Sequence, residues 1–251
     1  MQGIPHHFID FISVRENYNA GKFETDVLNF LESYFIQKKL ILVTGGSGLY
    51  IDAVCNGMDK VPGADVHIRA ELLRNFKENG ISALLEKLKS LDKKYYDAVD
   101  KNNPHRIIRA LEVCLISGLP YSSFRKKESA HHVLRNKLNF KKIKIGIELP
   151  REELYEKINN RVDRMIENGL VEEAGALLRF KDRNALKTVG YEELFCYLEG
   201  KIDLAEAVEL IKRNTRRFAK RQMTWFRKDK EIKWFHPEEK EKIITHITSK
   251  L

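Results

Sequence analysis

The sequence has little cysteine and no long apolar run, and both shortages exclude classes of protein. Among its 251 residues are 3 cysteines, an odd number without a C-x-x-C pair, which argues against a disulfide framework and a cysteine-based metal site. No run of about eighteen apolar residues occurs, so a membrane-spanning helix is not expected. The opening MQGIPHHFID lacks the basic and apolar regions of a signal peptide. We therefore expect a soluble cytoplasmic protein with no metal ligands of its own and no contact with a membrane.

Acidic residues are also in the minority. Lys and Arg total 45 against 36 Asp and Glu, which gives a formal net charge of +9. This excess favours a polyanionic partner such as nucleic acid, although many soluble enzymes are mildly basic. The positions of the cations therefore carry more information than their sum.

A third absence concerns the glycine-rich stretch ILVTGGSGLYIDAV at residues 41–54. It has the pattern of a strand, a turn with Gly45, Gly46 and Gly48, and a helix, which is typical of phosphate-binding turns. However, no Lys-Ser or Lys-Thr follows the glycines, as a nucleotide-binding P-loop requires. The backbone N–H groups of the turn and the Ser47 hydroxyl could still bind an anion or a base edge, or the glycines could serve the turn alone.

Alternating and helical apolar patterns predict an α/β protein with a helical insertion. We expect strands at Phe8–Ile12, Lys39–Thr44, Lys142–Leu149 and Glu231–Phe235, and helices at residues 25–37, 67–79, 81–90 and 104–117. The stretch Val61–Asp65 is predicted to be a connector, since it contains a Pro-Gly pair. Residues 61–136 are therefore predicted to form an all-helical insertion in a parallel-sheet core, made of residues 1–60 and of 137–251 with its C-terminal helices.

The segment Asn102–Val113 is predicted to begin a helix whose first turn is basic. Asn103 is a suitable N-cap, and Pro104 suits the first helical position. Arg106 and Arg109 lie on one face, whereas the buried face is expected to hold Ile107, Ile108, Leu111 and Val113. Cations near a helix N-terminus oppose the helix dipole, so they indicate either a bound phosphate or a solvated basic face.

A second helix, predicted over residues 150–166, carries a line of cations beside its apolar stripe. The stripe is formed by Leu154, Ile158, Val162 and Met165, and the cations are Lys157, Arg161 and Arg164. Such a line can hold a diphosphate through arginine. It can equally pair with the acids of the same helix, Glu152, Glu153 and Asp163.

The most cationic segment is Ile211–Lys228, which is also predicted to be helical. One face, expected to point into the protein, is formed by Val208, Ile211, Thr215, Phe218, Gln222 and Trp225. Two rows at i+4 spacing are expected outside, Lys212, Arg216 and Lys220 in one and Arg213, Arg217 and Arg221 in the other. These cations, with no acid among them, favour contact with a nucleic-acid backbone.

Upstream of this segment, the stretch NALKTVGYEEL at 184–194 is predicted to join a loop to a helix. Gly190 permits a close backbone approach there, and Tyr191 can stack or form a hydrogen bond. By itself the stretch could also be a simple turn.

Six blocks of the sequence stand in a fixed order: PHHFID (5–10), YNAGKFE (18–24), GGSGLY (45–50), NPHRIIRALEV (103–113), ALKTVGYEEL (185–194) and NTRRFAKRQMTWFR (214–227). In this order and at this spacing they resemble the bacterial tRNA dimethylallyltransferases. Any one block is a weak signal, whereas six ordered blocks that cover nearly the whole chain are specific.

The resemblance implies an enzyme that transfers a dimethylallyl group from dimethylallyl diphosphate to N6 of the adenosine 3′-adjacent to a tRNA anticodon, after extruding that base. It implies a core similar to P-loop nucleotide kinases and a helical insertion that clasps the anticodon stem-loop; we further expect a monomer. By position, Arg161 is expected on the diphosphate. Contacts with tRNA are expected from Ser47, Arg69, His105, Arg106, Ile107, Ile108, Arg109, Lys187, Thr188, Val189, Gly190, Tyr191, Glu192, Arg213, Arg217, Lys220 and Arg221.

The resemblance has a gap at the amino end. The family begins with a strand, a Gly-x-x-x-x-Gly-Lys-Ser/Thr phosphate loop, its helix and a strand ending in Asp-Ser, and none of these is in the sequence. In the family the loop grips the diphosphate, its hydroxyl holds Mg2+ and the aspartate is the proposed general base. That base is therefore expected upstream of Met1, and the polypeptide alone is predicted to have negligible transferase activity.

Two other functions stay open. One is a noncatalytic tRNA-binding remnant. The other is an adenylate isopentenyltransferase, against which the helical insertion and the basic segment Ile211–Lys228 argue, because a small substrate needs neither.

Overall fold

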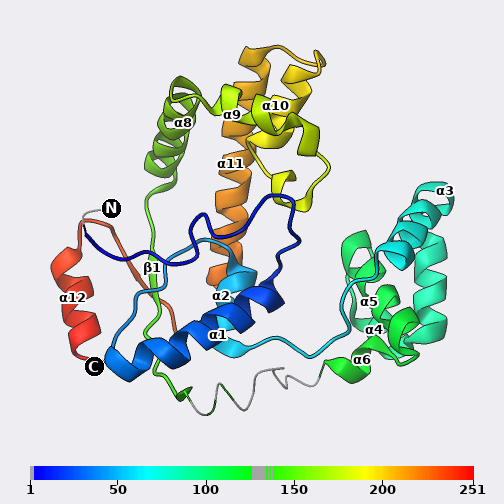
Figure 1. Cartoon of the computed structure of the whole chain (residues 1–251), viewed down its shortest axis with the longest axis horizontal. Helices are drawn as coiled ribbons and strands as arrows, with labels where there is room; N and C mark the ends of the chain where they lie inside the picture. Colours follow the sequence, from blue (N-terminus) through cyan, green and yellow to red (C-terminus); the bar gives the residue numbers. More distant parts are fainter. Residues whose placement is uncertain (1–2, 126–133, 135, 137) are drawn as a thin grey trace. The chain divides into compact units, whose positions relative to one another are not determined.

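The computed structural model describes residues 3–125, 134, 136 and 138–251, and most of this part is helical (Figure 1). Its helices are α1 (Ala20–Gln37), α2 (Gly48–Asn56), α3 (Val66–Leu91), α4 (Lys93–Ala98), α5 (Pro104–Ser117), α6 (Tyr121–Phe124), α8 (Arg151–Glu167), α9 (Leu170–Leu177), α10 (Tyr191–Leu198), α11 (Leu204–Phe226) and α12 (Lys240–Thr248). The short 3-10 helices η1 (Leu178–Phe180) and η2 (Asn184–Leu186) lie between α9 and α10. The strands of the described part are β1 (Ile145–Ile147) and β2 (Lys233–Phe235).

The chain divides into two compact units. Unit 1 comprises Met1–Phe23, Ile41–Ile51 and Phe140–Leu251, and unit 2 comprises Glu24–Leu40 and Asp52–Asn139. The division falls inside α1 and inside α2, so unit 2 holds the second parts of both helices besides the predicted insertion. The carboxyl end of that insertion, at residue 136, borders residues outside the described part, and its boundary stays a prediction.

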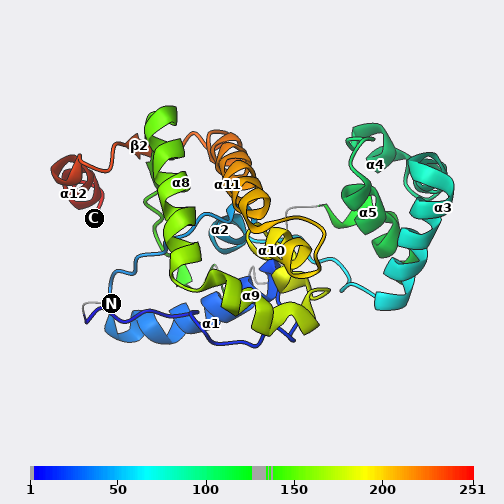
Figure 2. The same cartoon turned by 90° about the horizontal axis from the view of Figure 1, so that it is seen from above.

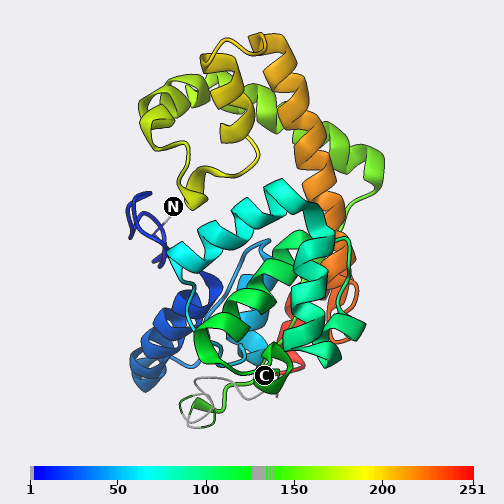
Figure 3. The ribbon, with the colours of Figure 1, turned by 90° about the vertical axis from the view of Figure 1, so that its right-hand side faces the viewer.

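The helices predicted for unit 2 are confirmed, at residues 67–79, 81–90 and 104–117. α3 is capped by Asp65, whose carboxylate accepts hydrogen bonds from the backbone N–H groups of His67 and Ile68 at 2.8 and 2.9 Å. It bends at Gly80, where φ is +71°, so the first two predicted helices are the two halves of α3 (Figure 3). The core shared by α3, α4 and α5 contains Leu72, Leu84, Leu88, Tyr95, Val99, Ile107, Ile108, Ala110 and Leu111.

Unit 1 contains the sheet. β1 and β2 pair in parallel, with Ile145 opposite Lys233 and Ile147 opposite Phe235. This pairing confirms the parallel sheet and the strands predicted around residues 142–149 and 231–235, although both strands are shorter than predicted. Next to the sheet, Lys144 forms ion pairs with Asp229 at 2.6 Å and with Glu231 at 2.8 Å.

The larger part of unit 1 is helical. α11 lies against α8 and α10, and α9 contacts both of these helices (Figure 2). Their shared core contains Val162, Leu170, Ala174, Leu186, Leu194, Phe195, Ala207 and Ile211. This core fixes α11 relative to α8 and to the loop before α10, which are the elements that carry most of the predicted site residues.

Two predicted strands are wrong. Residues 39–44 belong to no strand or helix, and Leu42 is 86% exposed. A β-rich run becomes a buried strand only where neighbouring strands pair with it, and in the described part the sheet consists of β1 and β2 alone, so neither pairs with residues 39–44. At residues 8–12, Phe8 and Asp10 have positive φ values of 62° and 52°, which an extended strand excludes.

In place of that strand, the amino-terminal segment of unit 1 folds over a small aromatic cluster. The Phe8 ring meets the rings of Phe11 and Phe23 edge to face, with centroids 5.5 and 5.8 Å apart. Tyr18 and Tyr50 extend the cluster through Phe11 and Phe23 respectively. Contacts between aromatic rings, and not strand pairing, therefore hold this segment in place.

Two further points concern membranes and thiols. Within the described residues, none of the helices combines the length and the apolar character that crossing a membrane needs. None of the three cysteines forms a disulfide, and only Cys114 is buried. Burial raises the pKa of the Cys114 thiol.

Candidate functional site

The exposed cations of α11 are the most prominent feature of unit 1. Arg213, Arg217, Lys220 and Arg221 are all exposed, and we call them the cationic surface. In the part of the chain that the structure describes, no carboxylate forms an ion pair with any of them. Arg217 donates a long hydrogen bond of 3.5 Å to Asn214, and Arg221 lies 5.6 Å from the centre of the Phe218 ring. The four cations are therefore free to bind an anion.

The other predicted outer row is wrong for two of its members. Lys212 pairs with Asp163 of α8 at 2.7 Å, and its side chain is only 15% exposed. Arg216 donates to the Asn159 side chain at 2.6 Å and lies over the ring of Tyr155. Because α8 packs along this side of α11, these cations hold two helices together, and the hydrogen bond to Asp163 raises the pKa of Lys212.

The predicted inward face of α11 is also only partly buried. Ile211 is 2% exposed, whereas Phe218 is 43% and Trp225 is 42% exposed. The core of unit 1 thus covers the first half of α11, while the second half packs on a different feature, the glycine turn.

The carboxyl-terminal end of α11 packs against the glycine turn, residues 45–48. A Cβ atom on Gly46 would lie 2.1 Å from Gln222 Nε2, and one on Gly48 would lie 2.4 Å from Trp225 Cδ1. Gln222 also donates a hydrogen bond of 2.8 Å to the Gly46 carbonyl. The two glycines are therefore explained by close packing against α11.

Ser47 lies between these two glycines and is exposed. Its carbonyl accepts hydrogen bonds from the N–H groups of Tyr50 and Ile51 at 3.1 Å, so it marks the start of α2. The packing of Gly46 and Gly48 thus brings Ser47 next to the end of α11 that carries Gln222 and Trp225.

The loop before α10 contains a glycine with a positive φ. The sequence suggested a close backbone approach at Gly190, but a Cβ atom there would meet no atom within 4 Å, so the backbone conformation explains this glycine. Gly190 has a φ of +105° and is buried, and its N–H donates to Glu193 Oε2 at 2.8 Å. Lys187, Thr188 and Glu192 are exposed, while Val189 packs against the core of unit 1. We refer to residues 187–192, which run from this loop into the first turn of α10 and expose Lys187, Thr188 and Glu192, as the exposed loop.

Tyr191 fastens the exposed loop to α9. Its hydroxyl donates a short hydrogen bond to Glu173, the second acid in the first turn of α9. Burial and, after it, the bond to the Glu173 carboxylate raise the pKa of Tyr191 to about 12. The phenol is therefore neutral at ordinary pH and acts as a hydrogen-bond donor.

On α8, the predicted cation line has two kinds of member. Lys157 pairs with Glu153 at 2.9 Å, which agrees with the alternative that these cations pair with acids of the same helix. Arg161 is exposed, and no ion pair or hydrogen bond joins its side chain to another described residue. Val162, its neighbour in sequence, is buried in the core, which anchors the backbone of Arg161.

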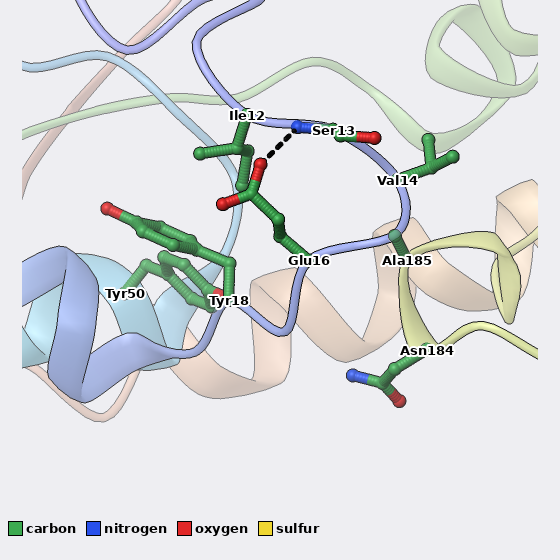
Figure 4. Close-up of a pocket in the computed structure, with 8 residues that line it drawn as sticks. All are labelled: Ile12, Ser13, Val14, Glu16, Tyr18, Tyr50, Asn184 and Ala185. Atoms are coloured by element: carbon green, nitrogen blue, oxygen red, sulfur yellow. Dashed lines mark hydrogen bonds between the residues drawn. The ribbon is translucent and has the colours of Figure 1, made fainter.

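Unit 1 also has a depression of about 370 Å³ next to the exposed loop (Figure 4). The rings of Tyr18 and Tyr50 line one side, and the Glu16 carboxylate accepts a hydrogen bond from the Ser13 N–H at 3.0 Å. Its lining residues are Ile12, Ser13, Val14, Glu16, Tyr18, Tyr50, Asn184 and Ala185. The depression lies between the amino-terminal segment and η2, whose first residue, Asn184, precedes Lys187 by three positions.

In unit 2, the predicted tRNA-binding arginines surround a buried acid. The Glu112 carboxylate, 0% exposed, accepts from Arg69 Nε at 3.1 Å, from Arg69 Nη2 at 2.8 Å and from Arg109 Nη1 at 2.6 Å. Arg109 also donates to the Pro62 carbonyl at 2.6 Å. These bonds tie the connector at 61–65 to α3 and α5, so both arginines have a structural role.

Of the other α5 residues predicted to contact tRNA, two are exposed and two are buried. His105 and Arg106 are exposed in the first turn of α5. Ile107 and Ile108 are 0% and 4% exposed and belong to the core of unit 2. The apolar pattern that placed them on the buried face of α5 is therefore confirmed. A contact of these two residues with tRNA would have to come from their backbone, and it stays a prediction.

The structure thus gathers Ser47, the exposed loop, Arg161 and the cationic surface in unit 1, and Arg69 and His105–Arg109 in unit 2. The buried acids Glu112 and Glu193 were not predicted. A single acid inside the apolar run of α5 was the available signal for Glu112. For Glu193 it was an acid three residues after Gly190, the spacing of a helix cap.

Comparison with known proteins places the chain in one family. Residues 1–229 match the family described as IPP transferase. The chain is 49% identical to the tRNA dimethylallyltransferase of Christiangramia forsetii, over 98% of the chain and 80% of that protein. It is 42% identical to tRNA dimethylallyltransferase 1 of Bacteroides fragilis, over 100% of the chain and 81% of that protein.

Solved structures agree. The full-length tRNA isopentenylpyrophosphate transferase of Bacillus halodurans is similar with a TM-score of 0.64 at 33% identity, covering 99% of this chain and 78% of that one. A eukaryotic dimethylallyltransferase acting on tRNA has the same fold, with a TM-score of 0.69 at 24% identity over 90% of this chain and 56% of that one. The predicted fold class, a P-loop-kinase-like core with helices, is that of these neighbours, and the chain belongs to the IPP transferase family.

Proposed function

We propose that the protein modifies tRNA by transferring a dimethylallyl group from dimethylallyl diphosphate to N6 of the adenosine 3′-adjacent to the anticodon. The observation that carries the proposal is the cationic surface of α11, in a chain whose relatives are named tRNA dimethylallyltransferases. A small substrate does not need four exposed cations on one helix, whereas the phosphates of an RNA hairpin do.

The proposed reaction assigns a role to each group of residues. N6 of the adenine attacks the allylic carbon, the carbon–oxygen bond breaks, its electron pair leaves with the diphosphate, and N6 releases its proton to water. Arg161, which is exposed and without an internal partner in the described residues, binds the diphosphate and stabilises its developing charge. The cationic surface and the exposed loop hold the anticodon stem-loop, to which Ser47 contributes its hydroxyl.

Neither a metal ion nor a general base is assigned to the described residues. They contain no group of three or more His, Cys, Asp or Glu side chains that could hold a metal ion. The family resemblance assigns the magnesium ion to the hydroxyl of a phosphate loop that is not in this sequence, so the residues present do not supply that ligand and no step is derived through the ion.

A binding measurement tests the proposal. We expect an anticodon-arm hairpin to bind with a log–log salt slope of about −3, roughly 0.7 to 0.9 for each of the cations on α11. Lys220→Gln should flatten this slope by nearly one phosphate contact. Lys240→Gln, which removes an exposed lysine from the start of α12, is the matched control. A slope near zero would rule out the RNA-binding function, whatever the affinity for AMP.

A transfer assay with radiolabelled dimethylallyl diphosphate separates binding from chemistry. Transfer to the hairpin, lost when the adenosine 3′ of the anticodon is replaced by uridine, supports the enzymatic proposal. Salt-dependent hairpin binding without any transfer would instead identify this polypeptide as a tRNA-binding protein.

A further inference from the structure

Glu193 is a buried acid that links two of the elements in the proposed RNA-binding site. Glu193 is 7% exposed and lies in the first turn of α10. One carboxylate oxygen, Oε2, accepts from the Gly190 N–H at 2.8 Å, and the other, Oε1, accepts from Asn214 Nδ2 of α11 at 2.7 Å. Both oxygens are therefore used, each by a different element.

The first bond determines the shape of the exposed loop. Gly190 has φ +105° and ψ −56°, a backbone conformation that other residues rarely adopt. Its N–H is buried and would lose its acceptor without Glu193, since a buried donor needs a partner. The carboxylate therefore keeps the turn that presents Lys187 and Thr188 to solvent.

The second bond orients a side chain of α11. Because Asn214 gives its amide N–H to Glu193, its carbonyl oxygen points the other way, and it accepts from Arg217 Nη1 at 3.5 Å. Arg217 belongs to the cationic surface. A chain of contacts thus runs from the loop through Glu193 and Asn214 to one of the exposed arginines.

An acid at this helix position is often only a cap. A cap, however, needs one carboxylate oxygen, and here the second is used by a side chain 21 residues further along, on the helix with the cationic surface. We propose that Glu193 is a positioning residue that holds the exposed loop and Arg217 in one arrangement for binding RNA. This inference rests on the proposed function of the same surface.

The test is a set of double-mutant cycles on hairpin binding. In Glu193→Gln the amide N–H2 faces one of the two donors, so one bond is lost, and we expect binding to weaken about tenfold. Asn214→Ala and Arg217→Gln should be non-additive, because Asn214 acts through Arg217. Glu206→Gln, which removes an exposed acid from the first turn of α11, is the control and should be additive with Arg217→Gln.

The possible outcomes distinguish failure of the role of Glu193 from failure of the proposed RNA-binding function. Wild-type protein that ignores the hairpin contradicts the proposed function itself. Wild-type binding with an additive Asn214/Arg217 cycle overturns the role of Glu193 and leaves the function standing. Should Glu193→Gln fail to fold, the Asn214/Arg217 cycle still decides, since neither of those variants removes the bond to Gly190.

Discussion

The two groups of arginines in this chain are held in opposite ways. In unit 2, Arg69 and Arg109 share the carboxylate of Glu112, which is fully buried. In unit 1, Arg213, Arg217 and Arg221 follow one another at i+4 spacing, and no described carboxylate pairs with them. Like charges at this spacing repel each other. The first group therefore stabilises the fold, while the second costs stability and is explained by an external anion.

The largest effect on stability should come from breaking the first group. Glu112→Ala leaves two guanidinium groups without their acceptor, and we expect the free energy of unfolding to fall by on the order of 3 kcal/mol. Urea unfolding followed by circular dichroism measures it. Glu86→Ala, an exposed acid in α3, should change it by less than about 0.5 kcal/mol. Equal effects for the two variants would mean that Glu112 does not organise unit 2.

A substitution in the glycine turn tests how closely α11, which carries the second group of arginines, packs against that turn. Gly48→Ala places a Cβ atom 2.4 Å from Trp225 Cδ1, and such overpacking costs about 1 to 3 kcal/mol. The matched control is Gly175→Ala in α9, because a Cβ there meets no atom within 4 Å and alanine favours a helix by up to about 1 kcal/mol. Thermal unfolding should therefore move in opposite directions for the two variants. A stabilising Gly48→Ala would contradict the close packing of α11.

Tyr191 sharpens the comparison through pH, since it fastens the exposed loop to α9. Its pKa is about 12 in the folded protein, above its ordinary value near 10, so the folded state holds the phenol proton more tightly. The stabilisation is complete below about pH 10 and is lost as the pH rises toward 12. Tyr191→Phe should be less stable by about 1 kcal/mol near neutral pH.

The readout is the difference between wild type and Tyr191→Phe across this pH range. Deprotonation of lysines affects both proteins alike and cancels. A difference that stays constant from pH 9 to 12 would contradict the bond between Tyr191 and Glu173.

The smallest effect on stability is expected from the second group itself. Replacing Arg213, Arg217 and Arg221 together by glutamine removes repulsion and no ion pair, so unfolding should change by less than about 0.5 kcal/mol. Hairpin binding should nevertheless lose about two units of its salt slope. Arg69→Gln with Arg109→Gln should show the reverse: lower stability and a smaller change of slope. If both sets behave alike, the comparison is wrong.

Local signals explain what could be predicted. Asn103, Pro104 and Gly190 mark helix starts whatever surrounds them, and the apolar pattern of α5 placed Ile107 on its buried face. The parallel strands β1 and β2 were recognisable because the isoleucines of β1 and the aromatic residues of β2 stand between helical patterns.

What could not be predicted depends on partners that are distant in sequence. Whether residues 39–44 join a sheet is decided by neighbouring strands, not by their own β propensity. Which cations of α11 are exposed is decided by α8, which covers Lys212 and Arg216. Likewise, Glu112 owes its burial to Arg69, 43 residues away.

The β1–β2 pairing has a consequence for the order of folding. Lys144 and Asp229, which bond beside the sheet, are 85 residues apart in the sequence, and closing so long a segment has a high entropic cost before any contact rewards it. The helices between them, α8 to α11, contact near neighbours and can assemble first. In pulsed hydrogen exchange during refolding, we expect the amides of α10 and α11 to gain protection before those of β1 and β2, so that the sheet forms late and completes unit 1.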